Sequence, residues 1–536
     1  AVTTAAAQFE AGRATADAIG RRRNAGVGLA WRQVEAGATR RHGLDPWLER
    51  TAWASVALVG GALRWASQPT RRRAIWGISR IMCKASPDSW TQLAQEAEST
   101  DKGKQLVDVR TKREEGLLPD TDAKVRYFGE SRAKPRVTLF RDQAAWCPYC
   151  QKVWLMLEEK RVDYATVKVP MRSYGDKPAS FLSKIPNGLL PAIEIDGRLM
   201  TESLDIMVTI EQIFPDPAKP MLPPAGSLMD RAQELLNLER KLFGAWCSYL
   251  FRPEMPFIGG SEGGFASALE EVDRQLGSNT ESPFFLPYEW PTLVDMQYVS
   301  HVERTIASAM YYKGFDVRKR YPNIDRWLSA YELLPHYMAT KSDYYTHCMD
   351  IPPQYGSCFP NDSEDARRAR AAIDPADLRL PLALQSEVEP LTAHQLDIPE
   401  GDYRIEAAWS VIRNHEAITK FCCRAAGPDV GKWARGNPTK CELADPYAKP
   451  SEAVMRPVDV VLRAVVMALL RGDVDVVRGA RATAEGEIAE PPGGWPQVAG
   501  CLAYLRDRVG SPRDLSMPAA KLLRAYLNEA VISLQA

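Results

Sequence analysis

The spacing of apolar residues changes at Pro135 and again after Pro223-Pro224. Between these points, strand-like runs alternate with segments of helical periodicity. The runs cover 136–140, 164–169, 192–195 and 198–200, and the helical segments cover about 148–160, 178–184 and 203–214. Asp196-Gly197 suits the two-residue turn of a hairpin. The order βαβαββα predicts one small α/β domain over residues 135–224.

Beyond Pro224 the alternation stops and helical spacing takes over. Thr292-Leu-Val-Asp295 predicts a helix start, because a hydroxyl and a carboxylate three residues apart can form a capping box. We expect an all-helical domain over 225–350 and a helical extension over 403–536, with one helix at 458–470 before Gly472. The proline-rich residues 351–402 carry few apolar clusters and are expected to wrap the surface.

Residues 1–134 are predicted to form an N-terminal extension. Tryptophans and arginines recur between Pro46 and about Ala97, which predicts short amphipathic helices. Such helices lie against a membrane surface or a partner protein, or they cover another part of the same chain. Both explanations stay open. Residues 98–134 are charged without a strong pattern and are predicted to be a linker.

Composition excludes several classes of function. The 536 residues hold 68 lysines and arginines and 68 aspartates and glutamates, so no global field favours nucleic acid. The uncharged, largely apolar stretch from Thr51 to Leu63 is shorter than the ~20 residues that a membrane-spanning helix needs. Ten cysteines are too sparse for a disulfide scaffold, and the six histidines show no zinc spacing. We therefore expect no nucleic acid, no membrane span and no metal.

One cysteine pair invites chemistry. Cys147-Pro-Tyr-Cys150 lies where a predicted strand passes into a predicted helix. A helix N-terminus presents free N–H groups and partial positive charge, so we expect a lowered pKa for Cys147, the nucleophile. Cys150, one turn in, is expected to be the shielded resolving thiol. The alternative is a chance pair that merely packs, which the neighbouring strand, helix and Pro148 disfavour.

Four sequence features together resemble one family. They are Cys147-Pro-Tyr-Cys150, Phe181-Leu-Ser-Lys184-Ile-Pro-Asn-Gly-Leu-Leu190-Pro191, Thr201-Glu202-Ser203 and the box from Thr292 to Asp295. In this combination the chain resembles the glutathione transferases of the cysteine type, the omega-like and dehydroascorbate-reductase-like classes, which share chemistry with glutaredoxins. The resemblance implies an α/β thioredoxin-like domain followed by an all-α domain, with additional, mostly helical, N- and C-terminal extensions.

The resemblance also implies a glutathione site. Lys184 would meet the glycine carboxylate, the backbone of Leu190 before a cis Pro191 would pair with the cysteinyl moiety, and Glu202 and Ser203 would grip the γ-glutamyl end. Tyr149 has a ring that could close over the thiol. Each residue has a plainer explanation: a surface lysine, a loop proline, a helix cap and a half-buried ring. Glutathione is the expected cosubstrate.

Runs such as Tyr311-Tyr-Lys-Gly314 and Asp350-Ile-Pro-Pro-Gln354 are similar to a branch of the family found in cyanobacteria and plastid-bearing eukaryotes. Seven arginines stand against three acidic residues from Ala1 to Arg41, a composition that suits organelle import. We expect a plastid protein, in the stroma or at the stromal face of the thylakoid, after removal of a transit peptide. A sequence cut at an arbitrary point is the alternative.

Two hypotheses of function follow. The first is an enzyme, a glutathione-dependent thiol transferase or reductase acting on an oxidised or disulfide substrate through Cys147. The second is an accessory or scaffold subunit of a larger plastid complex, with the N- and C-terminal extensions as docking surfaces and peripheral membrane contact as an option. Both can hold in one chain.

Overall fold

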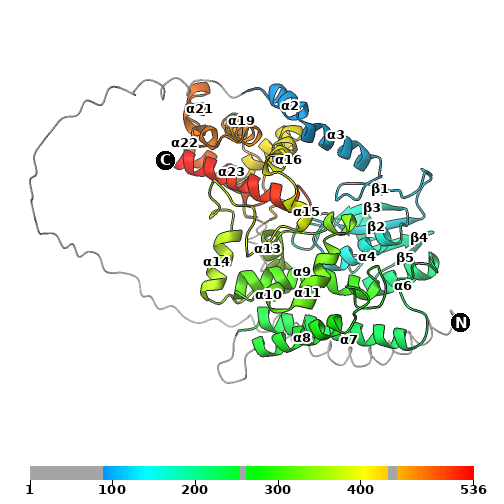
Figure 1. Ribbon diagram of the computed structural model, residues 1–536. Coiled ribbons are helices and arrows are strands. Elements are labelled where there is room, and N and C mark those ends of the chain that lie inside the picture. Colours follow the sequence, from blue (N-terminus) through cyan, green and yellow to red (C-terminus); the bar gives the residue numbers. More distant parts are fainter. Residues whose placement is uncertain (1–87, 254–260, 433–442) are drawn as a thin grey trace, which may run out of the picture. The chain divides into compact units, whose positions relative to one another are not determined.

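The computed structural model describes residues 88–253, 261–432 and 443–536 (Figure 1). The amphipathic helices predicted from Pro46 to Pro87, and the arginine-rich start of the chain, lie outside the described residues. Among the helices that are described, none combines the length and the apolar character needed to cross a membrane.

A five-stranded mixed sheet lies at the centre of the first part of the fold. Its order is β1-β3-β2-β4-β5, with β2 and β3 parallel and the other neighbours antiparallel. The strands are β1 Val125–Arg126, β2 Val137–Asp142, β3 Tyr164–Val169, β4 Ala192–Ile195 and β5 Arg198–Met200. The predicted strands and hairpin are confirmed. At the turn, Asp196 and Gly197 have φ of 49° and 80°, the left-handed pair that a two-residue hairpin requires.

Helices α4 Pro148–Glu159 and α5 Ala179–Leu182 connect strands of this sheet, and α6 Ser203–Ile213 follows the last strand. Helix α4 is the most enclosed, because it contacts β2, α6, α9 and α12. Its polar residues Gln151 and Lys152 are buried as well as its apolar ones. The spacing of apolar residues alone does not reveal such a helix, because neighbouring elements bury it on every side.

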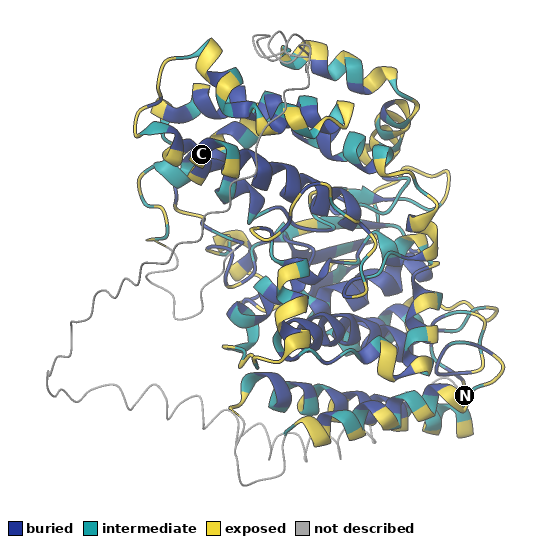
Figure 2. Ribbon diagram, turned by 60° about the vertical axis from the view of Figure 1, so that its left-hand side comes forward, coloured by how far each residue is buried: buried dark blue, intermediate teal, exposed yellow. Residues whose placement is uncertain are grey.

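The second part is all helical, as predicted. Its helices are α7 Ser227–Phe251, α8 Ser261–Gly277, α9 Leu293–Lys313, α10 Val317–Arg320, α11 Pro322–Tyr331, α12 Pro335–Met338 and α13 Tyr344–Tyr355. The predicted capping box starts α9, where the Asp295 carboxylate accepts from the backbone N–H and the hydroxyl of Thr292 at 2.8 Å each. Every residue of α9 except Tyr312 is buried (Figure 2).

The proline-rich segment contributes to a core, which corrects the prediction that it only wraps the surface. It contains α14 Glu364–Ile373 and α15 Ala393–Leu396. Leu378, Leu380 and Leu384 are buried and join the apolar core of the C-terminal extension. The pattern hides this role because these leucines are spaced among prolines in irregular structure, where no period marks a buried face.

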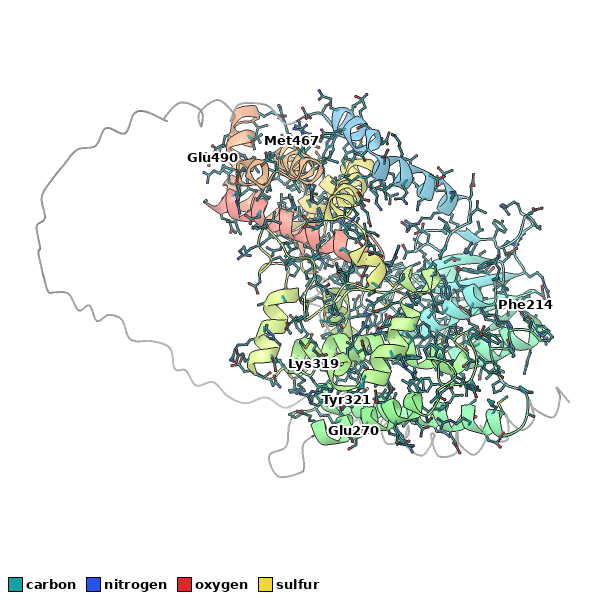
Figure 3. All side chains as sticks on the ribbon, in the orientation of Figure 1. Phe214, Glu270, Lys319, Tyr321, Met467 and Glu490 are labelled. Carbon is teal, nitrogen blue, oxygen red and sulfur yellow. The ribbon has the colours of Figure 1, made fainter. Side chains whose placement is uncertain are left out.

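The C-terminal extension is helical, as predicted, and includes α19, which ends at Gly472 in the left-handed conformation. Its elements are α16 Glu400–Arg413, α17 His415–Cys422, η1 Cys423–Ala426, η2 Glu452–Val454, α19 Met455–Arg471, α20 Val474–Arg478, α21 Ala480–Glu487, α22 Gly494–Arg506 and α23 Met517–Gln535. Met467, labelled in Figure 3, marks α19 in this part and packs on its core. A buried ion pair of 2.5 Å between Arg524 of α23 and Asp343 joins the extension to the start of α13.

Two N-terminal helices complete this core. They are α2 Trp90–Ser99 and α3 Asp101–Glu114, so the prediction of a linker is wrong over 101–114. Leu93 and Ala97 of α2 are fully buried among the C-terminal helices, and the Trp90 indole donates to Asp459 at 2.8 Å. Within α2, therefore, the amphipathic face covers another part of the same chain.

Candidate functional site

The topology brings the predicted site residues to one edge of the sheet. Strand β4 runs antiparallel to β2 with Ala192 opposite Phe140, so Leu190 and Pro191 lie beside the last residues of β2, near the loop that leads to Cys147. Strand β5 ends with Met200 opposite Ile193, so Glu202 and Ser203 follow at the same edge. Strand register therefore places the cysteine motif, the Leu190-Pro191 turn and the Glu202-Ser203 pair at one edge of the sheet.

Cys147 occupies the N-cap position of α4, and Pro148 is the first helical residue. No side chain makes a capping hydrogen bond to the first turn of this helix. Cys147 is partly exposed and Cys150 is buried. Burial, together with the neighbouring Cys147, raises the pKa of Cys150 well above its usual value, which keeps this thiol protonated.

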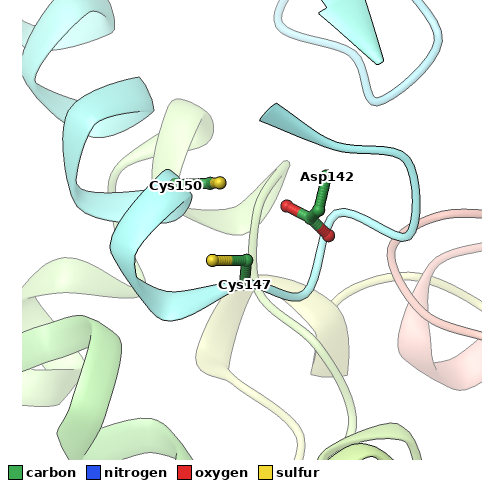
Figure 4. Close-up of side chains that lie close together, drawn as sticks. All are labelled: Asp142, Cys147 and Cys150. Atoms are coloured by element: carbon green, nitrogen blue, oxygen red, sulfur yellow. The ribbon is translucent and has the colours of Figure 1, made fainter. Parts of the chain in front are cut away.

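Asp142 is a site residue that the sequence motif did not reveal. It ends β2 as a buried residue, and its carboxylate accepts from the Trp146 N–H at 2.7 Å, which shapes the loop before Cys147. Its side chain and both thiols present atoms within 4.8 Å of one another (Figure 4). Two thiols and a carboxylate at this spacing suit a soft metal ion as well as redox chemistry, so the expected absence of a metal stays a prediction.

The residues predicted for glutathione lie at the rim of the site. The Lys184 ammonium is exposed and pairs with Glu194 of β4 at 2.7 Å. The Leu190–Pro191 bond is cis, and the Leu190 backbone has no backbone hydrogen-bond partner in the described chain. Ser203 is the first residue of α6, and its hydroxyl makes no hydrogen bond to a described residue, so it does not act as a helix cap. Glu202 precedes it with φ of 67°.

Lys177 is a second residue that the sequence reasoning missed. Partial burial lowers the pKa of its ammonium, while Cys150, Cys147 and Asp142 act in the opposite direction. Its Nζ donates to the Pro170 carbonyl at 2.7 Å. A lysine close enough to interact electrostatically with both thiols adds a positive charge to the site. It stands seven residues before Lys184 in an irregular segment, so no spacing rule pointed to it.

A face of the helical part lies against Tyr149. The ring of His301, on α9, meets the Tyr149 ring edge-on at 5.4 Å, and Phe243 of α7 stacks near the same imidazole at 4.8 Å. Burial, with Cys147 as the next cause, raises the pKa of Tyr149 to about 12, so the phenol stays neutral. Tyr149 is therefore packed between the two parts of the fold as well as lying beside the thiol.

Lys152 is buried in the same face. Its Nζ lies 4.9 Å from the Tyr149 ring centre, and no described carboxylate forms an ion pair with it. Burial lowers the pKa of Lys152 to about 8, although the Glu239 carboxylate and Cys147 favour its charged form. Glu239 itself is engaged by His301 at 2.7 Å. A buried ammonium without its own counterion lowers the stability of the folded chain. Packing alone therefore does not explain a lysine at this position.

A buried network holds Trp146, the residue directly before Cys147. Arg304 of α9 donates to the Trp146 carbonyl and, at 2.9 Å, to the Gln151 side chain. The Trp146 indole donates to His347 Nδ1 at 3.1 Å, so this imidazole is neutral with its proton on Nε2, 3.3 Å from Glu303. Burial lowers the pKa of His347, which favours the same neutral form. These hydrogen bonds therefore connect the loop before Cys147 to α9 and α13.

Comparisons with known proteins agree with this geometry. The family model described as glutathione S-transferase, N-terminal domain, matches residues 146–213. Glutathione S-transferase DHAR2 of Arabidopsis thaliana is 27% identical over 184 residues, 34% of this chain and 78% of the relative. Protein IN2-1 homolog A of Oryza sativa subsp. japonica is 27% identical over 199 residues, 37% of this chain and 78% of the relative. The central part of this chain is similar to glutathione transferases, and residues 146–213 match the N-terminal domain of that family.

In this transferase-like part Cys147 stands at the start of α4. The crystal structure of Chlamydomonas reinhardtii dehydroascorbate reductase aligns with 41% of this chain and 98% of its own, at 19% identity and a TM-score of 0.35. The relatives cover little more than a third of the chain, so the C-terminal extension and the N-terminal helices are additions to the transferase part.

Proposed function

We propose that this protein is a glutathione-dependent thiol transferase with Cys147 as the nucleophile. The observation that carries the proposal is the contrast between the two thiols. Cys147 is partly exposed at an uncapped helix N-terminus, whereas Cys150 is buried with a raised pKa. An accessible thiol at a helix start suits the attacking role, and a buried thiol with a raised pKa suits the resolving role.

The reaction runs through two exchanges. The Cys147 thiolate attacks the glutathionyl sulfur of a mixed disulfide, a new S–S bond to glutathione forms, and the substrate leaves as a thiolate that takes up a proton. Glutathione then attacks the adduct, forming glutathione disulfide and restoring the Cys147 thiolate. In a second route, Cys150 loses its proton and attacks the Cys147 sulfur, which releases reduced glutathione and leaves a Cys147–Cys150 disulfide.

The proposed glutathione-binding residues are Lys184, Leu190 and Ser203. Lys184 supplies a cation for one carboxylate, the Leu190 backbone supplies an extended edge, and the start of α6 at Ser203 supplies N–H donors for the other carboxylate. The pair between Lys184 and Glu194 is exposed, and such a pair is worth only about 0 to 1 kcal/mol, so glutathione competes with it readily.

The affinity for glutathione tests this proposal. We expect Lys184→Met to weaken glutathione binding about tenfold, the effect of one charge-assisted hydrogen bond of roughly 1.5 kcal/mol, measured by calorimetry on the reduced chain. The matched control is Lys168→Met, which removes an ion-paired lysine on β3. A chain that binds no glutathione, or a Lys184→Met chain that binds as tightly as the control, contradicts the proposal.

The second prediction concerns Lys152, whose buried ammonium lies beside the Tyr149 ring. Lys152→Met should raise the free energy of unfolding at pH 7 by roughly 2 to 3 kcal/mol, because the folded chain holds this ammonium with a pKa of about 8 instead of 10.5. Between these pH values the unfolded wild type binds more protons than the folded one. Wild-type stability therefore rises with pH across that window, and the advantage of the variant shrinks there.

The same variant should lose selectivity for anions. We expect a higher KM for the anionic disulfide 5,5′-dithiobis(2-nitrobenzoate) and an unchanged KM for neutral bis(2-hydroxyethyl) disulfide, measured with saturating glutathione. The gain in stability with loss of function is typical of a strained functional position. An equal change in both KM values, or a variant less stable than wild type at pH 7, contradicts a substrate role for Lys152.

The docking hypothesis has weaker support from the extension. Its apolar residues are buried in a core of their own, completed by α2, so no broad apolar face is left over for a partner within the described residues. The plastid location, the protein partners and the membrane contact stay predictions. Gentle extraction followed by native sizing distinguishes a free chain from a subunit of a larger assembly.

A further inference from the structure

A cavity of about 240 Å³ lies in the C-terminal extension, outside the transferase part of the chain. Helices α16, α17, α22 and α23 surround it, and Asp122 reaches it from the segment before β1. One side of its lining is apolar and buried, formed by Val411, Leu505, Val509 and Leu523. This side offers a dry surface to an aliphatic or aromatic group.

The other side carries three guanidinium groups, of which two lack a carboxylate partner. Arg513 pairs with Asp514 at 2.7 Å, and Asp122 is engaged by Lys168. Arg413 forms no ion pair or hydrogen bond with any described residue. Its guanidinium stacks on the Trp409 ring at 5.1 Å, which orients the group without neutralising it.

Arg508 also lacks a carboxylate partner among the described residues, and it is less exposed than Arg413. Its guanidinium lies 3.6 Å from the Tyr504 ring centre and donates to the Tyr504 carbonyl at 3.2 Å. Its Nε is buried and has no hydrogen-bond partner in the described chain. A buried N–H of a charged group without an acceptor is unfavourable, and an anion in the cavity would supply that acceptor.

The surroundings strengthen the positive potential. Partial burial and the nearby Arg110 of α3 lower the pKa of Arg413, with Asp122 acting against them. The two acidic residues that line the cavity, Asp122 and Asp514, already contact cations. Free positive charge therefore faces an apolar wall, which is the pattern of a site for an amphipathic anion.

We propose that this cavity binds a small organic anion, a carboxylate on a compact apolar body. A dry cavity of about 150 Å³ holds benzene, so this one accommodates a molecule of roughly ten to fifteen non-hydrogen atoms. The carboxylate would lie between Arg413 and Arg508, and the apolar body against Val411 and Leu523. The proposal is independent of the thiol chemistry at Cys147.

Calorimetry on the full chain tests this with three probes, 3-phenylpropionate, neutral 3-phenylpropanol and inorganic phosphate. We expect 3-phenylpropionate to bind at least tenfold more tightly than either of the others, because only it matches both sides of the cavity. Arg413→Gln with Arg508→Gln should abolish this preference. The control of equal charge change, Arg367→Gln with Arg481→Gln, removes exposed arginines on α14 and α21 and should retain it.

A cavity-filling variant tests the proposal independently, in case the double variant misfolds. Ser410→Phe keeps both arginines and fills the cavity, so it should also lose 3-phenylpropionate binding. Glutathione affinity should stay at the wild-type value in every variant, which shows that each chain is folded. The proposal is overturned if phosphate binds as tightly as 3-phenylpropionate, or if Ser410→Phe and the arginine double variant bind it like wild type.

Discussion

Replacement of Cys147 by serine should abolish thiol transferase activity, with a loss of at least about 1,000-fold in kcat/KM. A hydroxyl cannot form the S–S bond of the glutathionylated intermediate, and its high pKa leaves almost no alkoxide at neutral pH. The helix N-terminus, which favours an anion at this position, cannot compensate for that difference. The measurement is the release of glutathione from a glutathionylated peptide, followed by mass spectrometry.

Cys150→Ser is the matched control for this prediction. Cys150 is buried and its pKa is raised, so it resolves the adduct only in the second route, and glutathione replaces it in the first. We expect this variant to keep at least a tenth of the wild-type activity at millimolar glutathione. If Cys147→Ser stays active, or if the two serine variants lose activity equally, the assignment of the nucleophile is wrong.

The second large effect is expected at Arg304. Arg304→Met removes the donor to the Trp146 carbonyl, to the Gln151 side chain and, at 3.0 Å, to Glu303. These acceptors are buried, so the Glu303 carboxylate loses part of its compensation inside the protein. Breaking a buried pair of this kind costs about 3 to 5 kcal/mol, measured as the free energy of unfolding in urea.

Arg304 should also act on the thiol itself. The network fixes the carbonyl and the ring of Trp146, the residue before Cys147, so its loss should loosen the start of α4. We expect the pH midpoint of Cys147 alkylation by iodoacetamide to rise in Arg304→Met, measured on folded chain without denaturant. Arg304→Lys should restore part of this shift, since an ammonium can still reach one of the acceptors.

Arg318→Met is the control for general destabilisation. Arg318 also pairs with carboxylates, Asp325 and Glu332, but on α11 and the turn after it rather than at the thiol loop. It should lower stability and leave the alkylation profile of Cys147 at its wild-type midpoint. A profile that moves equally in the Arg304 and Arg318 variants would assign Arg304 to stability alone.

Local chemistry determined much of the transferase part of this chain from the sequence. The period-two runs, the Asp196-Gly197 turn and the Thr292–Asp295 box each define their element within a few residues. Cys147 could be placed at a helix start because Pro148 tolerates that position and an apolar strand precedes it. Such features depend on residues a few positions apart, and the sequence shows those residues directly.

Other conclusions depended on which elements meet in space. Asp142 and Lys177 join the thiol site through the register of the sheet and an irregular segment, and neither stands at a recognisable spacing from Cys147. Lys152 is buried on α4, which α9 and α12 contact, and no residue near Lys152 in the chain indicates those contacts. The charged region 101–114 looked like a linker because, apart from α2 next to it, it contacts α16, which begins more than 280 residues later.

The sequence by itself therefore determined the fold of the domain that carries the thiols and the identity of those thiols. Only the tertiary structure decided what surrounds them, namely Asp142 beside the sulfurs, Arg304 on the Trp146 carbonyl and Lys152 without a counterion. It also decided that α2 covers the chain's own C-terminal helices. The physical reason is that period and capping are set by residues a few positions apart, whereas burial and charge compensation are set by residues far apart in the chain.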